Sequence, residues 1–146
     1  MENLKILKVR ESAIIPTKGT FGAAGYDLYA SLDNDITLFP GKIAKIPCGV
    51  AIELPSSDYA AFMFARSGLG IKHGITLSNG VGVIDSDYRG ELQAGLIKLS
   101  GEPYVIHNGD RIAQLVIMKV ENFKFDVVSE LGASDRGKNG FGSTGI

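Results

Sequence analysis

The stretch DRIAQLVIMKV, residues 110–120, decides the fold class, because it is long enough to form either a helix or a strand. The spacing of Ile112, Leu115 and Val116 fits a helical stripe poorly. Its β-branched and nearly continuous apolar residues are instead typical of a strand covered on both faces. We therefore predict a doubly buried strand. Gln114 interrupts it, and packing does not explain this residue, because a buried amide needs hydrogen-bond partners.

Short apolar or alternating runs recur along the rest of the chain, separated by turn residues. The runs are LKILKV (4–9), YDLYA (26–30), ITLF (36–39), KIAKIPCGVAIEL (42–54), YAAFMF (59–64), VGVID (81–85), ELQAGLIKL (91–99), YVI (104–106) and FKFDVV (123–128). Many short strands at near-regular spacing predict an all-β fold of the sandwich, barrel or jelly-roll type. A short helical turn near residues 69–72 is also compatible with the sequence.

Composition restricts the function classes. The chain has 146 residues, enough for one domain with a real core, and a net charge of -1 that argues against general attraction to nucleic acid or membranes. Any anionic ligand must therefore meet a local cluster of cations. The single cysteine, Cys48, excludes an internal disulfide and is expected to be a buried, inert thiol. We see no signal peptide or membrane span, so we expect a cytoplasmic protein, with a nuclear location also open.

The stretch VGVIDSDYRGEL, residues 81–92, is the first that could carry chemistry. Apolar runs flank DSDYRG, so we expect a β-hairpin with Asp85 and Tyr88 at its tip. A carboxylate fixed there can orient and deprotonate a water, and an aromatic ring beside it can stack on a sugar or base. The alternative is that Asp85, Ser86 and Asp87 only form a turn.

Two further stretches place charge near the ends of predicted strands. In FARSGLGIKHG, residues 64–74, the group Arg66, Ser67 and Gly68 follows a strand, an arrangement that can hold an oxyanion such as phosphate. A solvated arginine is the alternative. In AAGYDLYA, residues 23–30, Asp27 lies within a short strand, and a surface-facing aspartate is the alternative. One cysteine and two histidines leave no zinc-ligand spacing.

The C-terminal stretch RGKNGFGSTGI, residues 136–146, cannot form a core, and its four glycines raise the entropy cost of ordering it. It is either a frayed end or an arm that orders over a ligand. We place the boundary between a core, residues 1–131, and a glycine-rich arm, residues 132–146.

Five stretches together carry a resemblance that none carries alone: AGYDLYA, RSGLGIKHG, NGVGVIDSDYRGEL, GDRIAQLVI and RGKNGFGSTG. In this order they resemble the five motifs of the trimeric dUTP diphosphatase (dUTPase) family, over residues 24–145. The resemblance implies a distorted jelly roll of the β-clip type that forms a homotrimer. It also implies active sites at subunit interfaces and a flexible C-terminal arm that closes over a neighbour's site.

The resemblance implies hydrolysis of dUTP to dUMP and pyrophosphate, which keeps uracil out of DNA and supplies dUMP for dTMP synthesis. Asp85 would be the catalytic residue that activates water for attack at the α-phosphorus. Tyr88 would pack against the deoxyribose and exclude a ribose 2′-hydroxyl. The residues that would bind uracil are Asn79, Gly82, Val83 and Ile84, with Phe141 stacking on the base.

The phosphates would be bound by Arg66, Ser67, Gly68, Gln114, Arg136, Gly142, Ser143 and Thr144. The implied cofactor is Mg²⁺, held mainly by the triphosphate, with Asp27 reaching it only through water. Ala65, Gly70 and Asn139 depart from the family pattern, and none of them is an implied chemical contact.

Two alternatives stay open beside this interpretation. The first is a catalytically silent homologue that binds dUTP, against which the intact Asp85 argues. The second is an enzyme of the dCTP deaminase type, which needs a glutamate where this chain has Gly95.

Overall fold

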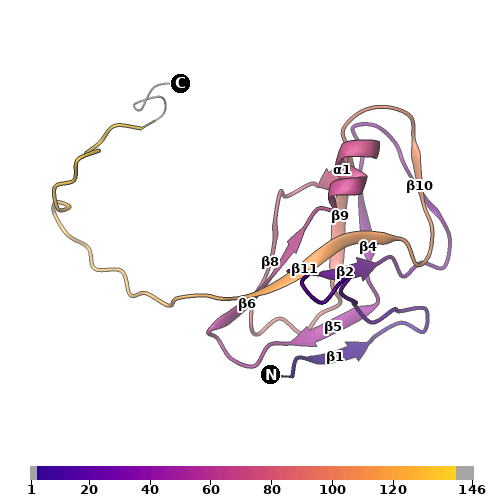
Figure 1. Ribbon diagram of the computed structural model, residues 1–146, viewed down its shortest axis with the longest axis horizontal. Helices are drawn as coiled ribbons and strands as arrows, with labels where there is room; N and C mark the ends of the chain where they lie inside the picture. Colours follow the sequence, from indigo (N-terminus) through magenta and orange to yellow (C-terminus); the bar gives the residue numbers. More distant parts are fainter. Residues whose placement is uncertain (1–2, 141–146) are drawn as a thin grey trace.

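The computed structural model describes residues 3–140 and confirms the all-β prediction (Figure 1). In chain order the elements are β1 (Lys5–Lys8), β2 (Tyr26–Tyr29), β3 (Ile36–Leu38), β4 (Ile43–Pro47), β5 (Val50–Glu53), β6 (Tyr59–Phe64), α1 (Ser67–His73), β7 (Ile75–Leu77), β8 (Gly82–Ile84), β9 (Gln93–Lys98), β10 (Tyr104–Ile106) and β11 (Arg111–Lys119). The short helix α1 lies where the sequence allowed a helical turn. No helix in residues 3–140 has the length and apolar character that a membrane crossing requires.

β11 lies inside a four-stranded antiparallel sheet with the order β2-β11-β6-β8. The strand predicted from residues 110–120 is therefore confirmed. Its burial on both faces holds only for the first half, where Ile112, Ala113 and Leu115 are buried. The second half is more open, and Met118 is exposed. Within the sheet, Gln114 pairs with Asp27 on β2 and with Phe64 on β6, so β11 brings three distant segments together.

The second main sheet has the order β4-β9-β7, and two shorter pairs, β1-β5 and β3-β10, complete the body. Buried side chains from all of these strands except β1 form one core, in which Leu28, Ile46 and Leu96 are at most 1% exposed, and Ile6 of β1 packs against it. The run KIAKIPCGVAIEL is two strands rather than one, because the chain turns at Gly49 with φ +71°. A Cβ at this position would lie 2.6 Å from the Ser31 hydroxyl oxygen, so only glycine fits.

Cys48 precedes this turn and is buried, as predicted. Burial raises the pKa of its thiol to about 12, since an apolar environment disfavours the thiolate. The thiol is therefore protonated and unreactive at neutral pH.

The predicted hairpin over residues 81–92 is wrong. β8 pairs with β6 in the four-stranded sheet, whereas β9 pairs with β4 and β7 in the other sheet. The chain therefore crosses between sheets twice, from β7 to β8 and from β8 to β9. The local pattern of two apolar runs around a polar turn favours a hairpin, but pairing with distant strands decides the outcome.

Lys98 is the one buried charged residue among those described, with 3% of its surface exposed. Its ammonium group donates hydrogen bonds to the carbonyl oxygens of His73, the last residue of α1, and of Ser100. A cation at the C-terminal end of a helix is favourable because the last carbonyls lack partners there. Lys98 thus ties α1 to the end of β9.

The N-terminal segment is attached to the body by an ion pair between Arg10 and Glu91. Arg10 Nε lies 2.6 Å from Glu91 Oε1, and its Nη2 donates to Oε2 at 3.3 Å. The Gly49 amide also donates to Oε1, at 2.9 Å. Hydrogen bonding from Arg10, followed by that from Gly49, lowers the pKa of the Glu91 carboxyl, and partial burial opposes this shift only in part.

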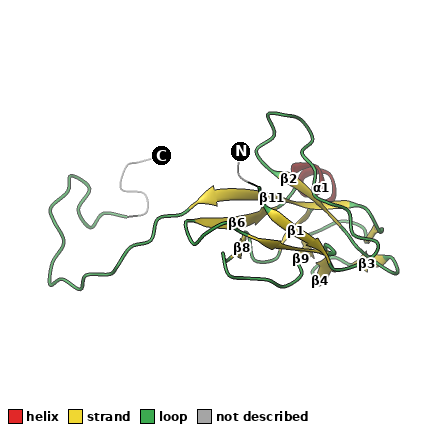
Figure 2. Ribbon diagram, turned by 90° about the horizontal axis from the view of Figure 1, so that it is seen from below, coloured by secondary structure: helices red, strands yellow, loops and turns green. Residues whose placement is uncertain are grey.

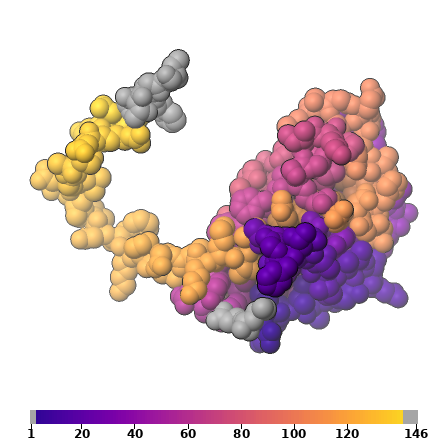
Figure 3. Space-filling view, viewed as in Figure 1, coloured from indigo at the N-terminus to yellow at the C-terminus, as the bar shows by residue number. Residues whose placement is uncertain are grey.

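Beyond β11 the chain leaves the compact body. Asn122 still reaches it through a 3.3 Å hydrogen bond to the Ser57 carbonyl, and residues 123–140 then extend away and are exposed (Figures 2 and 3). The run FKFDVV, expected as a strand, has no strand assignment in this single chain. The boundary predicted after residue 131 stays a prediction about an assembled protein, because the compact part of one chain ends near Asn122.

We predict that Glu91 contributes an acid-dependent part of the stability. Its folded pKa lies below the ordinary value of 4.5, so the contribution is complete above about pH 4.5 and is lost as pH falls through the folded pKa. Glu91→Gln should therefore lower the urea midpoint at pH 7 more than at pH 4. Glu130→Gln, on the exposed segment, is the control and should keep the wild-type profile. An unchanged midpoint difference between the two pH values would show that the pair contributes no such dependence.

Candidate active site

The first group of predicted site residues lines one cavity of about 240 Å³ between the two main sheets. The predicted residues around it are Asn79, Gly82, Val83, Ile84, Asp85 and Tyr88. They come from β8 and from its two connections, to β7 before it and to β9 after it. These connections are where the chain crosses between sheets, so the topology itself brings the predicted base, sugar and water-activating residues together.

The β7–β8 connection is a tight turn. The Gly80 amide donates to the Leu77 carbonyl at 3.2 Å, and the Val81 amide donates to the Asn79 carbonyl at 2.9 Å. Gly80 has φ +74°, a value that favours glycine. In the described part of the chain β8 has a strand neighbour on one side only, so its second row of backbone groups can bind a planar, polar ligand.

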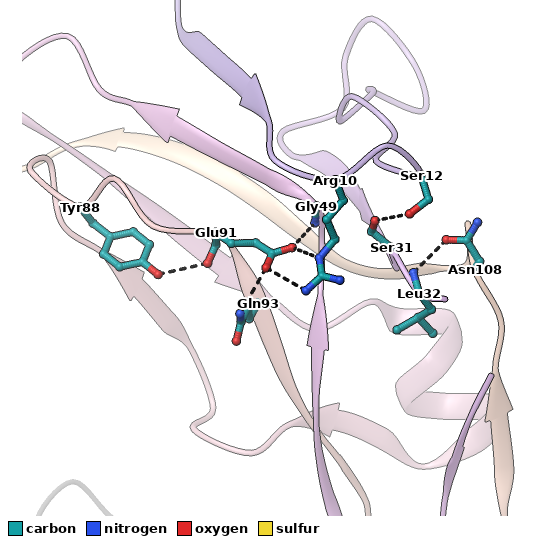
Figure 4. Close-up of polar contacts among 9 residues, drawn as sticks. All are labelled: Arg10, Ser12, Ser31, Leu32, Gly49, Tyr88, Glu91, Gln93 and Asn108. Carbon is teal, nitrogen blue, oxygen red and sulfur yellow. Dashed lines mark hydrogen bonds and ion pairs between the residues drawn. The ribbon is translucent and has the colours of Figure 1, made fainter. Parts of the chain in front are cut away.

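Tyr88 lies at the mouth of this cavity and is 45% exposed. Its amide donates to the Asp85 carbonyl at 3.2 Å, which closes the turn that carries the predicted catalytic carboxylate. Its hydroxyl donates to the Glu91 carbonyl oxygen at 3.1 Å (Figure 4). The ring folds back over Gly90, where an added Cβ would lie 2.4 Å from the hydroxyl oxygen. Glycine at position 90 is therefore required for this ring position.

The second group of predicted residues surrounds Asp27. Its Oδ1 lies 3.0 Å from Arg66 Nε, and its Oδ2 lies 3.3 Å from Arg111 Nη1. The Asp27 side chain is 14% exposed, so the alternative of a surface-facing aspartate is wrong. Arg66 also donates to the Arg111 carbonyl at 3.3 Å, which joins β2, the end of β6 and the start of β11.

Gln114 belongs to this second group. It is partly buried, and its Nε2 donates to the Ala65 carbonyl at 3.1 Å, next to Arg66. Ser67 and Gly68 are the first two residues of α1, directly after the extended backbone of Arg66. The Gln114 side chain, which the sequence pattern left unexplained, thus holds the backbone at Ala65. This position lies just before Arg66, between the end of β6 and the start of α1.

Arg111 is a residue of this group that the sequence interpretation missed. An arginine at the start of a strand, after the turn HNGD, normally indicates a solvated position. The signal that could have found it is the long antiparallel pairing of β11 with β2, which places Arg111 opposite Tyr29, two residues from Asp27.

The two groups do not line the same cavity in one chain. Arg66 and Arg111 border a separate cavity of about 210 Å³, which shares no lining residue with the cavity beside Asp85 and Tyr88. Arg136 lies on the exposed C-terminal segment, where its carbonyl accepts a 3.2 Å hydrogen bond from the Asn139 amide. The remaining predicted residues lie outside the described range: Phe141, Gly142, Ser143 and Thr144.

The position that a deaminase would use holds Gly95 rather than a glutamate. A Cβ at Gly95 would lie 2.9 Å from the Ser78 hydroxyl oxygen. Glu91, the nearest glutamate in sequence, directs its carboxylate to Arg10 and Gly49 instead. Within residues 3–140 no three histidine, cysteine, aspartate or glutamate side chains are grouped as metal ligands.

Comparison with known proteins gives the family. The dUTPase family model matches residues 11–145. The chain is 52% identical over 145 residues to the deoxyuridine 5′-triphosphate nucleotidohydrolase of Desulfitobacterium hafniense (strain DSM 10664 / DCB-2), covering 98% of this chain and 96% of that protein. It is 47% identical over 143 residues to the protein of the same name from Neisseria meningitidis serogroup A, covering 98% and 95%.

Solved structures agree with the sequence relatives. The dUTPase of Staphylococcus bacteriophage 80alpha with dUPNHPP has a TM-score of 0.88 at 26% identity, with 100% of both chains covered. A mutant dUTPase from phage phi11 of S. aureus, whose structure reveals the coordination of a structural Mg(II) ion, has a TM-score of 0.79 at 25% identity and covers 90% of this chain and 100% of its own. The expected jelly-roll fold of the β-clip type is therefore confirmed, and the chain belongs to the dUTPase family.

Proposed function

We propose that this protein is a dUTP diphosphatase that converts dUTP and water to dUMP and pyrophosphate. The family membership supports the reaction class. The observation that carries the proposal is the gathering of Asn79, Asp85, Tyr88 and the free edge of β8 around one cavity. This arrangement combines a base-reading edge, an aromatic ring and a carboxylate within one small volume.

Uracil would be read by the edge of β8 and by Asn79. Uracil presents O4 as an acceptor and N3–H as a donor, whereas cytosine reverses both. A site with fixed hydrogen-bonding groups rejects such a mismatch by about 10⁴–10⁵. Gly82 supports the close fit, since a Cβ there would lie 3.1 Å from Met63 Cβ, so this strand lies tight against β6. Tyr88 beside it would cover the deoxyribose and leave no space for a 2′-hydroxyl.

Asp85 would accept a proton from the attacking water. The water oxygen then bonds to the α-phosphorus as the bond from that phosphorus to the bridging oxygen breaks, and pyrophosphate leaves. The Tyr88 amide fixes the Asp85 main chain, so the carboxylate is attached to an ordered turn. A positioned general base of this kind contributes roughly 10²–10⁴-fold to the rate.

The triphosphate would bind to the second group. Arg66 and Arg111 supply guanidinium groups, Gln114 an amide, and Ser67 and Gly68 the start of α1. Both carboxylate oxygens of Asp27 already accept from these arginines, so Asp27 fits Mg²⁺ only through an intervening water. When bound by the phosphates, Mg²⁺ neutralises their charge.

The complete site would form between three copies of the chain. Arg66 and Arg111 of the second group line a cavity separate from the one that the first group lines, which supports a site completed by a neighbour. The exposed run 123–128 supports the same assembly, because Phe123, Phe125 and Val127 are 81–100% exposed and alternate as in a strand with one covered face. A closed threefold ring lets every copy give and receive the same contacts. The arm from Arg136 would then close over the bound nucleotide.

The proposed site predicts which nucleotides are hydrolysed. Pyrophosphate release with Mg²⁺ should be fast for dUTP and slower by orders of magnitude for dCTP, dTTP and UTP, because each of these violates the base or the sugar contact. Release from several nucleotides would overturn the assigned specificity. Binding of dUTP without release would favour the catalytically silent homologue, and ammonia release from dCTP would favour the deaminase.

Asp85→Asn should lower kcat by roughly 10²–10⁴-fold, because the amide cannot accept the proton from water. Binding of dUTP and the oligomeric state should be preserved. Asp87→Asn is the matched control, since it removes a carboxylate from the same turn without being assigned a role. Equal losses in both variants, or a near-normal rate for Asp85→Asn, would remove Asp85 from the mechanism.

Truncation after Leu131 should leave the assembly intact, as measured by light scattering, and should lower kcat/KM at least about tenfold. The reason is that the deleted arm includes Arg136 and Phe141, and stacking of one aromatic ring on a base contributes roughly 1–3 kcal/mol. Phe141→Leu in the full chain separates the stacking contribution from the rest. If the truncated chain unfolds or dissociates, the arm is structural rather than a lid.

A further inference from the structure

Glu91 makes contacts in two directions that link the cavity to the N-terminal segment. On one side its carboxylate is bound by Arg10 and by the Gly49 amide. On the other side its main-chain carbonyl accepts the Tyr88 hydroxyl at 3.1 Å. Figure 4 shows these contacts as a continuous series from Arg10 through Glu91 to Tyr88.

The Glu91 end of this series is firmly held. Its side chain is only 16% exposed, and the Gln93 amide adds a longer contact at 3.4 Å to Oε2. The next residue is fixed as well, since the Leu92 amide donates to the Val50 carbonyl at 2.8 Å and its carbonyl accepts from the Cys48 amide at 2.9 Å. The Glu91 carbonyl is therefore a fixed point relative to the core.

The Tyr88 ring has less support of its own. It is 45% exposed, and its far edge lies close over Gly90, where an added Cβ would come within 2.4 Å of the hydroxyl oxygen. An aromatic side chain on a turn keeps one orientation only where a second contact holds its far end. Here that contact is the hydrogen bond from its hydroxyl to Glu91.

We propose that Glu91 is a positioning residue, which holds the Tyr88 ring over the sugar position and thereby sets the discrimination between deoxyribose and ribose. The sugar role rests on the proposed function, whereas the contact between Tyr88 and Glu91 is observed in the structure. Glu91 does not need to touch the nucleotide. Because the base would be read separately on β8, its loss should change sugar discrimination without changing base discrimination.

The activity test compares kcat/KM for dUTP, UTP and dCTP. In Tyr88→Phe the dUTP:UTP ratio should fall by roughly three- to tenfold, which corresponds to one neutral hydrogen bond. Glu91→Ala keeps the carbonyl but removes the contacts to Arg10 and Gly49 that hold it, so the ratio should fall in the same direction by a smaller factor. The dUTP:dCTP ratio should stay unchanged, and the double variant should lose no more than Tyr88→Phe alone. Glu91→Gln should recover part of the ratio, since its amide oxygen still accepts from Arg10 and Gly49.

Glu53→Ala is the matched control. Glu53 also pairs with the N-terminal segment, through Lys5 at 2.7 Å, but it lies on β5 and does not line the cavity. It should keep both ratios. Equal losses for UTP and dCTP in Glu91→Ala, or an unchanged dUTP:UTP ratio, would overturn the assigned role.

A second measurement needs no substrate. The chain has five tyrosines, so fluorine NMR of protein labelled with 3-fluorotyrosine gives few signals, and Tyr88→Phe assigns the relevant one. Glu91→Ala should shift this signal, and Glu53→Ala should not. An unmoved signal would overturn the link between Glu91 and Tyr88. Absence of dUTP hydrolysis in the wild type, with the signal still shifted by Glu91→Ala, would overturn the proposed function and the sugar role while retaining the link.

Discussion

The double passage of residues 75–98 between the two main sheets is the constraint on which the rest of the site depends. β7 belongs to one sheet, β8 to the other, and β9 returns to the first. The two connections therefore lie where the sheets meet, and a cavity of about 240 Å³ forms between them. The same passage leaves β8 at a sheet edge. An edge strand has backbone groups that can pair with other strands, and residues of this edge strand also line the cavity.

Two clusters of ion pairs join segments that lie far apart in the sequence. Arg10 and Glu91 lie 81 positions apart in the chain, and Asp27 lies 39 from Arg66 and 84 from Arg111. Neither of these ion-pair clusters is fully exposed. The charges are therefore held by directed hydrogen bonds within the protein rather than by water alone. Asp27 also separates two guanidinium groups that would otherwise repel each other. The triphosphate of the proposed substrate would offer these guanidinium groups the same kind of oxygen, so they would be oriented before it binds.

The sequence predicted those features that depend on local pattern. The strand in residues 110–120, the helical turn near Leu69 and the buried Cys48 all follow from the type and spacing of neighbouring residues. The hairpin over residues 81–92 was wrong because β8 and β9 each pair with strands far away in sequence. β7 was missed although β3, with the same sequence ITL, was predicted, and Arg111 was missed because its partner, Asp27, is distant. The order of the five motifs identified the family even though the strand pairing was predicted wrongly, because motif order can be compared without knowing which strands pair.

The proposed assembly would account for two features of the single chain, its separate cavities and its exposed apolar tail. The cavity beside Asp85 and Tyr88 shares no lining residue with the cavity that Arg66 and Arg111 border, as expected if a second copy completes the proposed site. Phe125 is fully exposed within an alternating run of apolar residues, and exposing so much apolar surface to water is unfavourable. Covering that run with a neighbouring copy would also carry Arg136 away from its own body. In the proposed assembly a neighbouring copy would thus complete both the site and the tail, without a change in the fold of residues 3–120.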